Sequence, residues 1–160
     1  MLSLAACIDP SERRSGTWLS GEVVTELPAD WSFTDAHEEI AIQVATPYAI
    51  PHSVTIWCAA LDGTLYVGAR DLETKRWPGW VDDDPRVRLG IDGKLYDVAL
   101  VPLDEVAAAA ELARLRAAYA LKYKLPAVPP DAPPGAVPPT RYWRVVAPGQ
   151  GAGGARAQRE

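Results

Sequence analysis

The chain has 160 residues, which is enough for one domain with a single hydrophobic core and short tails, and too few for two independent cores. Its apolar fraction of 48% and its charged fraction of 23% are ordinary for a folded globular protein. The net charge of −5 argues against a nucleic-acid partner, and no apolar stretch approaches the roughly 20 residues of a membrane-spanning helix.

The two cysteines, Cys7 and Cys58, are far apart and lack any nearby thiol or histidine at metal-ligand spacing. The sequence therefore predicts neither a disulfide nor a metal site, and Cys58 is expected in the core. The stretch "LSLAAC", ending at Cys7, resembles the lipobox of bacterial lipoproteins, but too few residues precede it for a complete signal. Residues 1–16 are thus expected to be a tail that is either a clipped lipoprotein signal or a chance match. A cytoplasmic protein and a lipid-anchored envelope protein both stay open.

The first half of the chain predicts strands separated by turns. Residues 18–27 alternate well enough for a strand, which Pro28 ends. A short helical turn and then a strand are expected within residues 30–48. His37 lies on this connector beside two acids and is expected to be solvated rather than to bind a metal.

Two hairpins are the clearest local signals. Two β-rich runs flank Asp62 and Gly63, which suit the positive backbone angles of a tight turn. The same pattern recurs in residues 85–103 about Asp92 and Gly93, with alternating charged and apolar residues. Both segments are predicted to be antiparallel hairpins.

The second half begins with helix-forming residues from Asp104 to Leu125, acidic at the start and basic at the end. Its buried face is predicted to hold Leu112, Leu115 and Tyr119. A proline-rich connector, 126–139, leads to a final strand near residues 141–147, and residues 148–160 are expected to be disordered. The element order favours an α+β domain, mainly β, over residues 17–147: a small antiparallel barrel with helices packed on it.

The stretch "TKRWPGWVDDDPRV", residues 74–87, places two cations and two tryptophans in one turn-rich segment. We expect a surface loop that either binds a ligand or packs over the core. It belongs to a longer pattern: "IPHSVTIWCAALDGTLYVGA", then Lys75, then "DDPRVRLGIDG". In order and spacing, this pattern resembles the flavin-binding split barrel of the pyridoxamine 5′-phosphate oxidase-like superfamily, over residues 39–103. The segments "PGW", "KYKLP" and "YWRVVAP" are similar to its deazaflavin-dependent nitroreductase branch.

The resemblance implies an FMN-binding-type split β-barrel, which is an antiparallel Greek-key barrel, with one substantial C-terminal helix. It implies that cations of the 70–76 segment hold the cofactor phosphate, that polar residues of the preceding strand line the ring edge, and that the two tryptophans cover the ring. The residues that it places at the cofactor are His52, Ser53, Thr55, Ala69, Arg70, Lys75, Arg76, Trp77 and Trp80.

The resemblance further implies a homodimeric oxidoreductase with FMN, or the 8-hydroxy-5-deazaflavin coenzyme, acting on an unknown small molecule. No catalytic acid or base stands out, because the cofactor carries the chemistry in such enzymes. The alternative is a split barrel without enzymatic activity, either cofactor-free or binding haem or another small ligand. Ala69 favours this alternative, since many flavin binders of the family have a hydroxyl residue there. The cations could instead pair with nearby acids, and the tryptophans could belong to the core or to a dimer contact.

Overall fold

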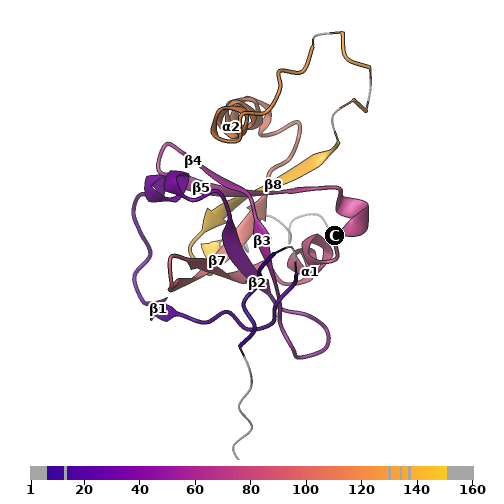
Figure 1. Cartoon of the computed structure of the whole chain (residues 1–160). Helices are drawn as coiled ribbons and strands as arrows, with labels where there is room; N and C mark the ends of the chain where they lie inside the picture. Colours follow the sequence, from indigo (N-terminus) through magenta and orange to yellow (C-terminus); the bar gives the residue numbers. More distant parts are fainter. Residues whose placement is uncertain (1–6, 13, 130, 134, 137, 151–160) are drawn as a thin grey trace, which may run out of the picture.

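The structure is a computed structural model that describes residues 7–12, 14–129, 131–133, 135–136 and 138–150 (Figure 1). Its strands are β1 (Glu22–Val24), β2 (Ile40–Val44), β3 (His52–Ile56), β4 (Cys58–Leu61), β5 (Thr64–Arg70), β6 (Arg86–Ile91), β7 (Lys94–Pro102) and β8 (Thr140–Val146). Its helices are the α-helices α1 (Trp77–Asp83) and α2 (Ala109–Lys122) and the short 3-10 helices η1 (Ser32–Ala36) and η2 (Leu72–Thr74).

The eight strands form one sheet in the order β3-β2-β6-β7-β8-β5-β4, and β1 pairs with β7 beside this path. All pairs are antiparallel except β1 with β7. The two ends of the path, β3 and β4, are separated in the chain by Trp57 alone, so the sheet must curl back on itself. The Gly68 N–H donates to the Trp57 carbonyl oxygen across this junction (3.4 Å). The prediction of an α+β split barrel is confirmed.

Both predicted hairpins are confirmed, and their turns follow from local chemistry. Asp62 and Gly63 have φ of 52° and 76°, and Asp92 and Gly93 have φ of 49° and 73°. Two successive residues with positive φ are the requirement of the hairpin turn that matches strand twist. The final strand, β8, and the buried helix face of Leu112, Leu115 and Tyr119 are confirmed as well.

Three elements differ from the sequence prediction. The expected strand at 18–27 shrinks to the three residues of β1. The expected helix at 104–125 begins only at Ala109, because the Asp104 carboxylate accepts the N–H groups of Val106 and Ala107 and holds a separate turn. The expected loop at 74–87 contains α1, whose first turn tolerates Pro78.

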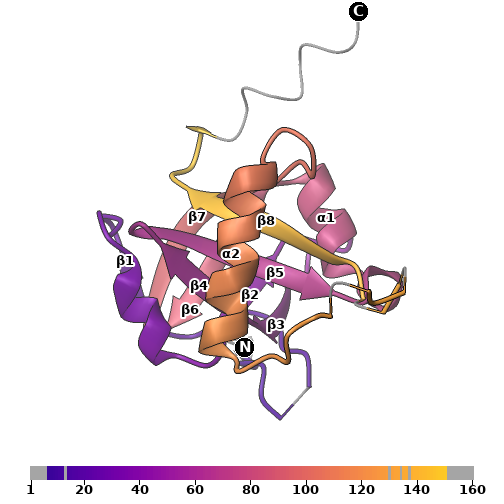
Figure 2. The same ribbon diagram turned by 90° about the horizontal axis from the view of Figure 1, so that it is seen from above.

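The helices cover opposite faces of the sheet, as the alternation of side chains along β8 shows. Tyr142 packs on Tyr119 of α2, with ring centroids 5.1 Å apart. The next residue, Trp143, points the other way and packs on Trp77 of α1 at 5.2 Å. Figure 2 shows α2 lying across β4, β5 and β8. The larger part of the core lies inside the curl of the sheet, and a second part lies under α2.

The elements from β1 to β8 lie within the predicted domain, residues 17–147, and part of the predicted tail before it is also packed. Gly16 and Ser53 exchange backbone hydrogen bonds, which protects the edge of β3. Cys7 is exposed and Cys58 is buried, the latter as predicted. Most of the lipobox-like stretch and most of the tail expected at 148–160 lie outside the described residues. No helix in the described part of the chain is long and apolar enough to span a bilayer.

Candidate functional site

An open groove of about 590 Å³ runs beside α1 and is the candidate site. Most of its lining comes from residues 72–83, which form η2, the segment after it and α1. Two residues reach it from elsewhere: Tyr48, from the loop before β3, and Arg141, from β8. We call it the α1 groove.

Two buried side chains anchor α1 and thereby orient the groove. Trp77 and Val81, one helical turn apart, are 3% and 2% exposed and point into the core. Trp80 is only half-buried and lines the groove. The two tryptophans of this segment therefore have different positions: Trp77 lies in the core, which was one of the two interpretations left open, and Trp80 is a groove wall.

The two cations that begin the segment lie at the groove. Lys75 and Arg76 are both exposed and both line it. Neither makes an ion pair within the described part of the chain, where Asp82 instead pairs with Arg141. The Lys75 ammonium donates to the Arg70 carbonyl oxygen.

Arg70 and Ala69 lie away from the groove lining. Ala69 is 3% exposed and belongs to the core inside the sheet. Arg70, the next residue of β5, points to the α2 face, where its guanidinium lies 5.9 Å from the ring centroid of Trp57. Arg70 thus contributes its carbonyl oxygen near Lys75, while its charge lies on the other face of the sheet.

The three β3 residues lie in three different environments. His52 packs edge-on against Trp80 (ring centroids 5.3 Å apart) and supports that wall from outside the groove lining. Burial lowers the pKa of His52 below its usual value. The Ser53 side chain is fully buried against Gly16, and its hydroxyl has no hydrogen-bond partner among the described residues. Thr55 is exposed.

A second groove, of about 540 Å³, lies on the other side of the loop before β3. Its charged side chains form two ion pairs of their own, Arg86 with Asp84 and Arg88 with Asp97, with shortest distances of 2.7 Å in each. Because these pairs neutralise the wall, this groove lacks the unpaired cations that the α1 groove presents.

No family model matches the sequence, and no curated protein matches it. Among solved structures, the chain is similar to a conserved hypothetical protein of Mycobacterium tuberculosis, with 19% identity, a TM-score of 0.54, and coverage of 72% of this chain and 76% of that one. The chain has the split-barrel fold.

Two further solved structures are also similar to this split barrel. One is a FAD-binding protein of Mesorhizobium loti, with 14% identity, a TM-score of 0.49, and coverage of 71% of this chain and 82% of that one. The other is a pyridoxamine 5′-phosphate oxidase-related, FMN binding protein of Nostoc punctiforme, with 13% identity, a TM-score of 0.45, and coverage of 76% and 83%. At these identities the similarity concerns the fold alone.

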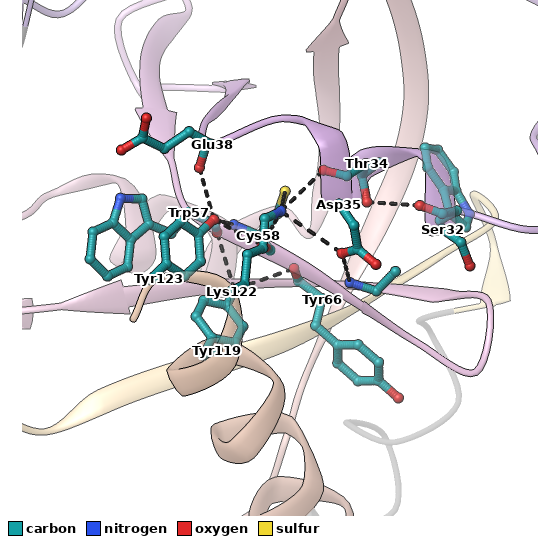
Figure 3. Close-up of polar contacts among 12 residues, drawn as sticks. Ser32, Thr34, Asp35, Glu38, Trp57, Cys58, Tyr66, Tyr119, Lys122 and Tyr123 are labelled. Carbon is teal, nitrogen blue, oxygen red and sulfur yellow. Dashed lines mark hydrogen bonds and ion pairs between the residues drawn. The ribbon is translucent and has the colours of Figure 1, made fainter. Parts of the chain in front are cut away.

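A polar cluster at the end of α2 fixes that helix on the barrel (Figure 3). The Lys122 ammonium donates to the carbonyl oxygens of Thr34 (3.0 Å) and Cys58 (2.8 Å). The Tyr123 hydroxyl accepts the Cys58 N–H (2.9 Å), and its ring stacks on Trp57 at 4.1 Å. Burial raises the pKa of Tyr123. These groups satisfy the backbone at the β3–β4 junction, so the cluster is structural.

The split barrel thus brings together at the α1 groove three of the nine residues expected at the cofactor, Lys75, Arg76 and Trp80, with His52 behind Trp80. Sequence reasoning missed Tyr48 and Arg141. Both residues are far along the chain from residues 72–83, so the sequence does not show that they lie beside that segment. Only their residue types, an aromatic and a cation, could have suggested a role in the site.

Proposed function

We propose that this split barrel binds a flavin in the α1 groove and acts as an oxidoreductase on a small molecule. FMN is the first candidate for this flavin. The observation that carries the proposal is the position of Lys75 and Arg76. Both are exposed, both lack an ion-pair partner in the described structure, and both share a groove with Trp80. A phosphate group favours charge-assisted hydrogen bonds from such cations, and a flat, half-apolar isoalloxazine packs well on an indole.

The groove fits such a ligand in charge and in size. Lys75, Arg76 and Arg141 line it. Because Asp82 neutralises Arg141, two unpaired cations face one acid, Asp83, although the whole chain carries a net charge of −5. Its volume of about 590 Å³ is within the usual range of small-molecule sites. When bound, the flavin supplies the hydride chemistry, and the protein binds and orients it. Lys75 and Arg76 would hold the phosphate, and Trp80 would carry the ring, with His52 fixing the indole from behind.

We further propose that two chains form the complete site. The groove is open, so one chain would leave much of a bound FMN in water, whereas ligand sites usually bury most of the ligand surface. A homodimer would cover the exposed side, in agreement with the resemblance of residues 39–103 to flavin-binding split barrels.

The test is a titration of the purified protein with FMN, and separately with the deazaflavin coenzyme, followed by tryptophan quenching and by the flavin absorption band. We expect saturable binding of one ligand per chain. Lys75→Ala and Arg76→Ala should each weaken FMN binding roughly tenfold or more, the effect of one charged hydrogen bond. Lys94→Ala is the matched control, because it removes an exposed lysine outside the groove. If the wild-type protein binds neither ligand, the cofactor-free alternative holds.

A further inference from the structure

The loop between β2 and β3, residues 45–51, holds an aromatic side chain out toward the α1 groove. The Thr46 hydroxyl donates to the Ile50 carbonyl oxygen (2.7 Å) and accepts the Tyr48 N–H (3.2 Å), which closes the loop on itself. Ala49 has φ of 66°, a left-handed conformation that a residue with a side chain adopts at a cost. The loop therefore has a defined conformation, which holds Tyr48 at the groove.

Tyr48 is unusually exposed for an aromatic residue at a groove. The residue is 65% exposed, and it lines the α1 groove. Its ring centroid lies 6.4 Å from that of Trp80, and the two planes are nearly perpendicular, at 89°. We call this pair the aromatic corner. His52 supports Trp80, so one plane of the corner is fixed by packing while the other stands in solvent.

A corner of two perpendicular rings suits a flat ligand. A ring that stacks on one of the two planes presents its own edge to the face of the other. Stacking and edge-to-face contact are the two favourable arrangements of aromatic pairs. A phosphate has no comparable surface to place there. Because Lys75 and Arg76 line the same groove, the site offers different partners to the two ends of an aromatic phosphate.

We propose that Tyr48 is a specificity-determining residue that selects for the ring of the bound ligand, while the cations select for its phosphate. This inference rests on the proposed function of the α1 groove. It assigns a role to Tyr48, a residue that the sequence analysis did not place at the site.

Three probes separate the two kinds of contact: FMN has ring and phosphate, riboflavin has the ring alone, and inorganic pyrophosphate has the charge alone. Tyr48→Ala should weaken FMN and riboflavin binding by a similar factor, roughly three- to tenfold, and leave pyrophosphate binding unchanged. Tyr48→Phe should retain most of the affinity, because it keeps the ring. Lys75→Ala should show the opposite pattern, losing FMN and pyrophosphate but not riboflavin.

The matched control is Leu121→Ala, which removes an exposed apolar side chain from α2, away from the groove lining and from the loop at residues 45–51. Thermal unfolding of each variant checks that the fold is intact, which we expect because Tyr48 is exposed. Unchanged FMN affinity in Tyr48→Ala would overturn the role of Tyr48 and leave the proposed function standing. An equal loss for pyrophosphate, or an equal loss of FMN affinity in Leu121→Ala, would also overturn it. A wild-type protein that binds no FMN would overturn both proposals.

Discussion

One carboxylate sets the charge that Arg141 presents to the α1 groove. Asp82 holds the Arg141 guanidinium through two hydrogen bonds of 2.9 and 2.5 Å, and both side chains are partly exposed. Asp82→Asn removes the neutralising charge and keeps the side-chain size, so Arg141 becomes available to an anion. We expect FMN to bind about two- to fivefold more tightly, with a steeper salt dependence. Titrations at low and high ionic strength measure both effects.

The matched control for this change is Asp62→Asn, because Asp62 forms an exposed ion pair with Arg114 outside the groove lining. It alters the net charge of the chain equally. If both variants change FMN affinity to the same extent, the effect belongs to overall charge and Arg141 has no specific part in anion binding.

His52 makes part of the stability depend on pH. Burial lowers the pKa of His52 in the folded chain below the usual 6.5. As the pH falls, His52 is therefore protonated in the unfolded chain before it is protonated in the folded chain, which favours unfolding. The contribution of His52 should be complete above about pH 6.5 and be lost as the pH falls from there to the folded-state pKa. Urea unfolding across this window should show the loss, and His52→Phe should remove it while keeping an aromatic ring against Trp80.

The chain has only two histidines, so NMR can follow both. His37 lies on the connector between η1 and β2, and the variant His37→Gln assigns the two imidazole signals. A folded-state pKa of His52 at or above that of a free histidine would contradict the prediction.

At the scale of elements, Lys122 contributes to the attachment of α2 to the barrel (Figure 3). The Lys122 side chain is only 12% exposed and serves two backbone carbonyl groups, those of Thr34 and Cys58. Lys122→Met keeps the length of the side chain but removes the charged donor. The Thr34 oxygen then keeps only the His37 N–H, and the Cys58 oxygen keeps the Tyr123 hydroxyl. We expect the free energy of unfolding to fall by about 1–3 kcal/mol in urea denaturation.

Lys124→Met is the comparison, since Lys124 is exposed and lies two residues further along. Lys124→Met should lower the free energy of unfolding much less than Lys122→Met does. FMN affinity should be unchanged in both variants because neither lysine lines the α1 groove. Equal stability losses in the two variants would show that the hydrogen bonds of Lys122 do not contribute to the attachment of α2.

Some elements of the fold could be predicted from the sequence and others could not. The two hairpins were predictable because aspartate and glycine encode their turns within two residues. α1 was missed because Pro78 and Gly79 suggested a loop, whereas burial of Trp77 and Val81 stabilises a short helix there. Tertiary packing outweighed local propensity at this point. The aromatic corner was missed for a similar reason: the contact of Tyr48 with Trp80 exists only after β2 and β6 have paired.

At the scale of the whole molecule, the open groove leads to a prediction about assembly. A single chain of 17.3 kDa presents Tyr48 and Ile50, 65% and 53% exposed, beside a groove too open to enclose a flavin. A second chain would bury this apolar surface and the exposed side of the ligand together. We therefore expect sedimentation velocity to give twice the mass of one chain, and FMN affinity to fall when dilution separates the chains. A monomer that binds one FMN with undiminished affinity would contradict the dimer and show that the α1 groove is complete by itself.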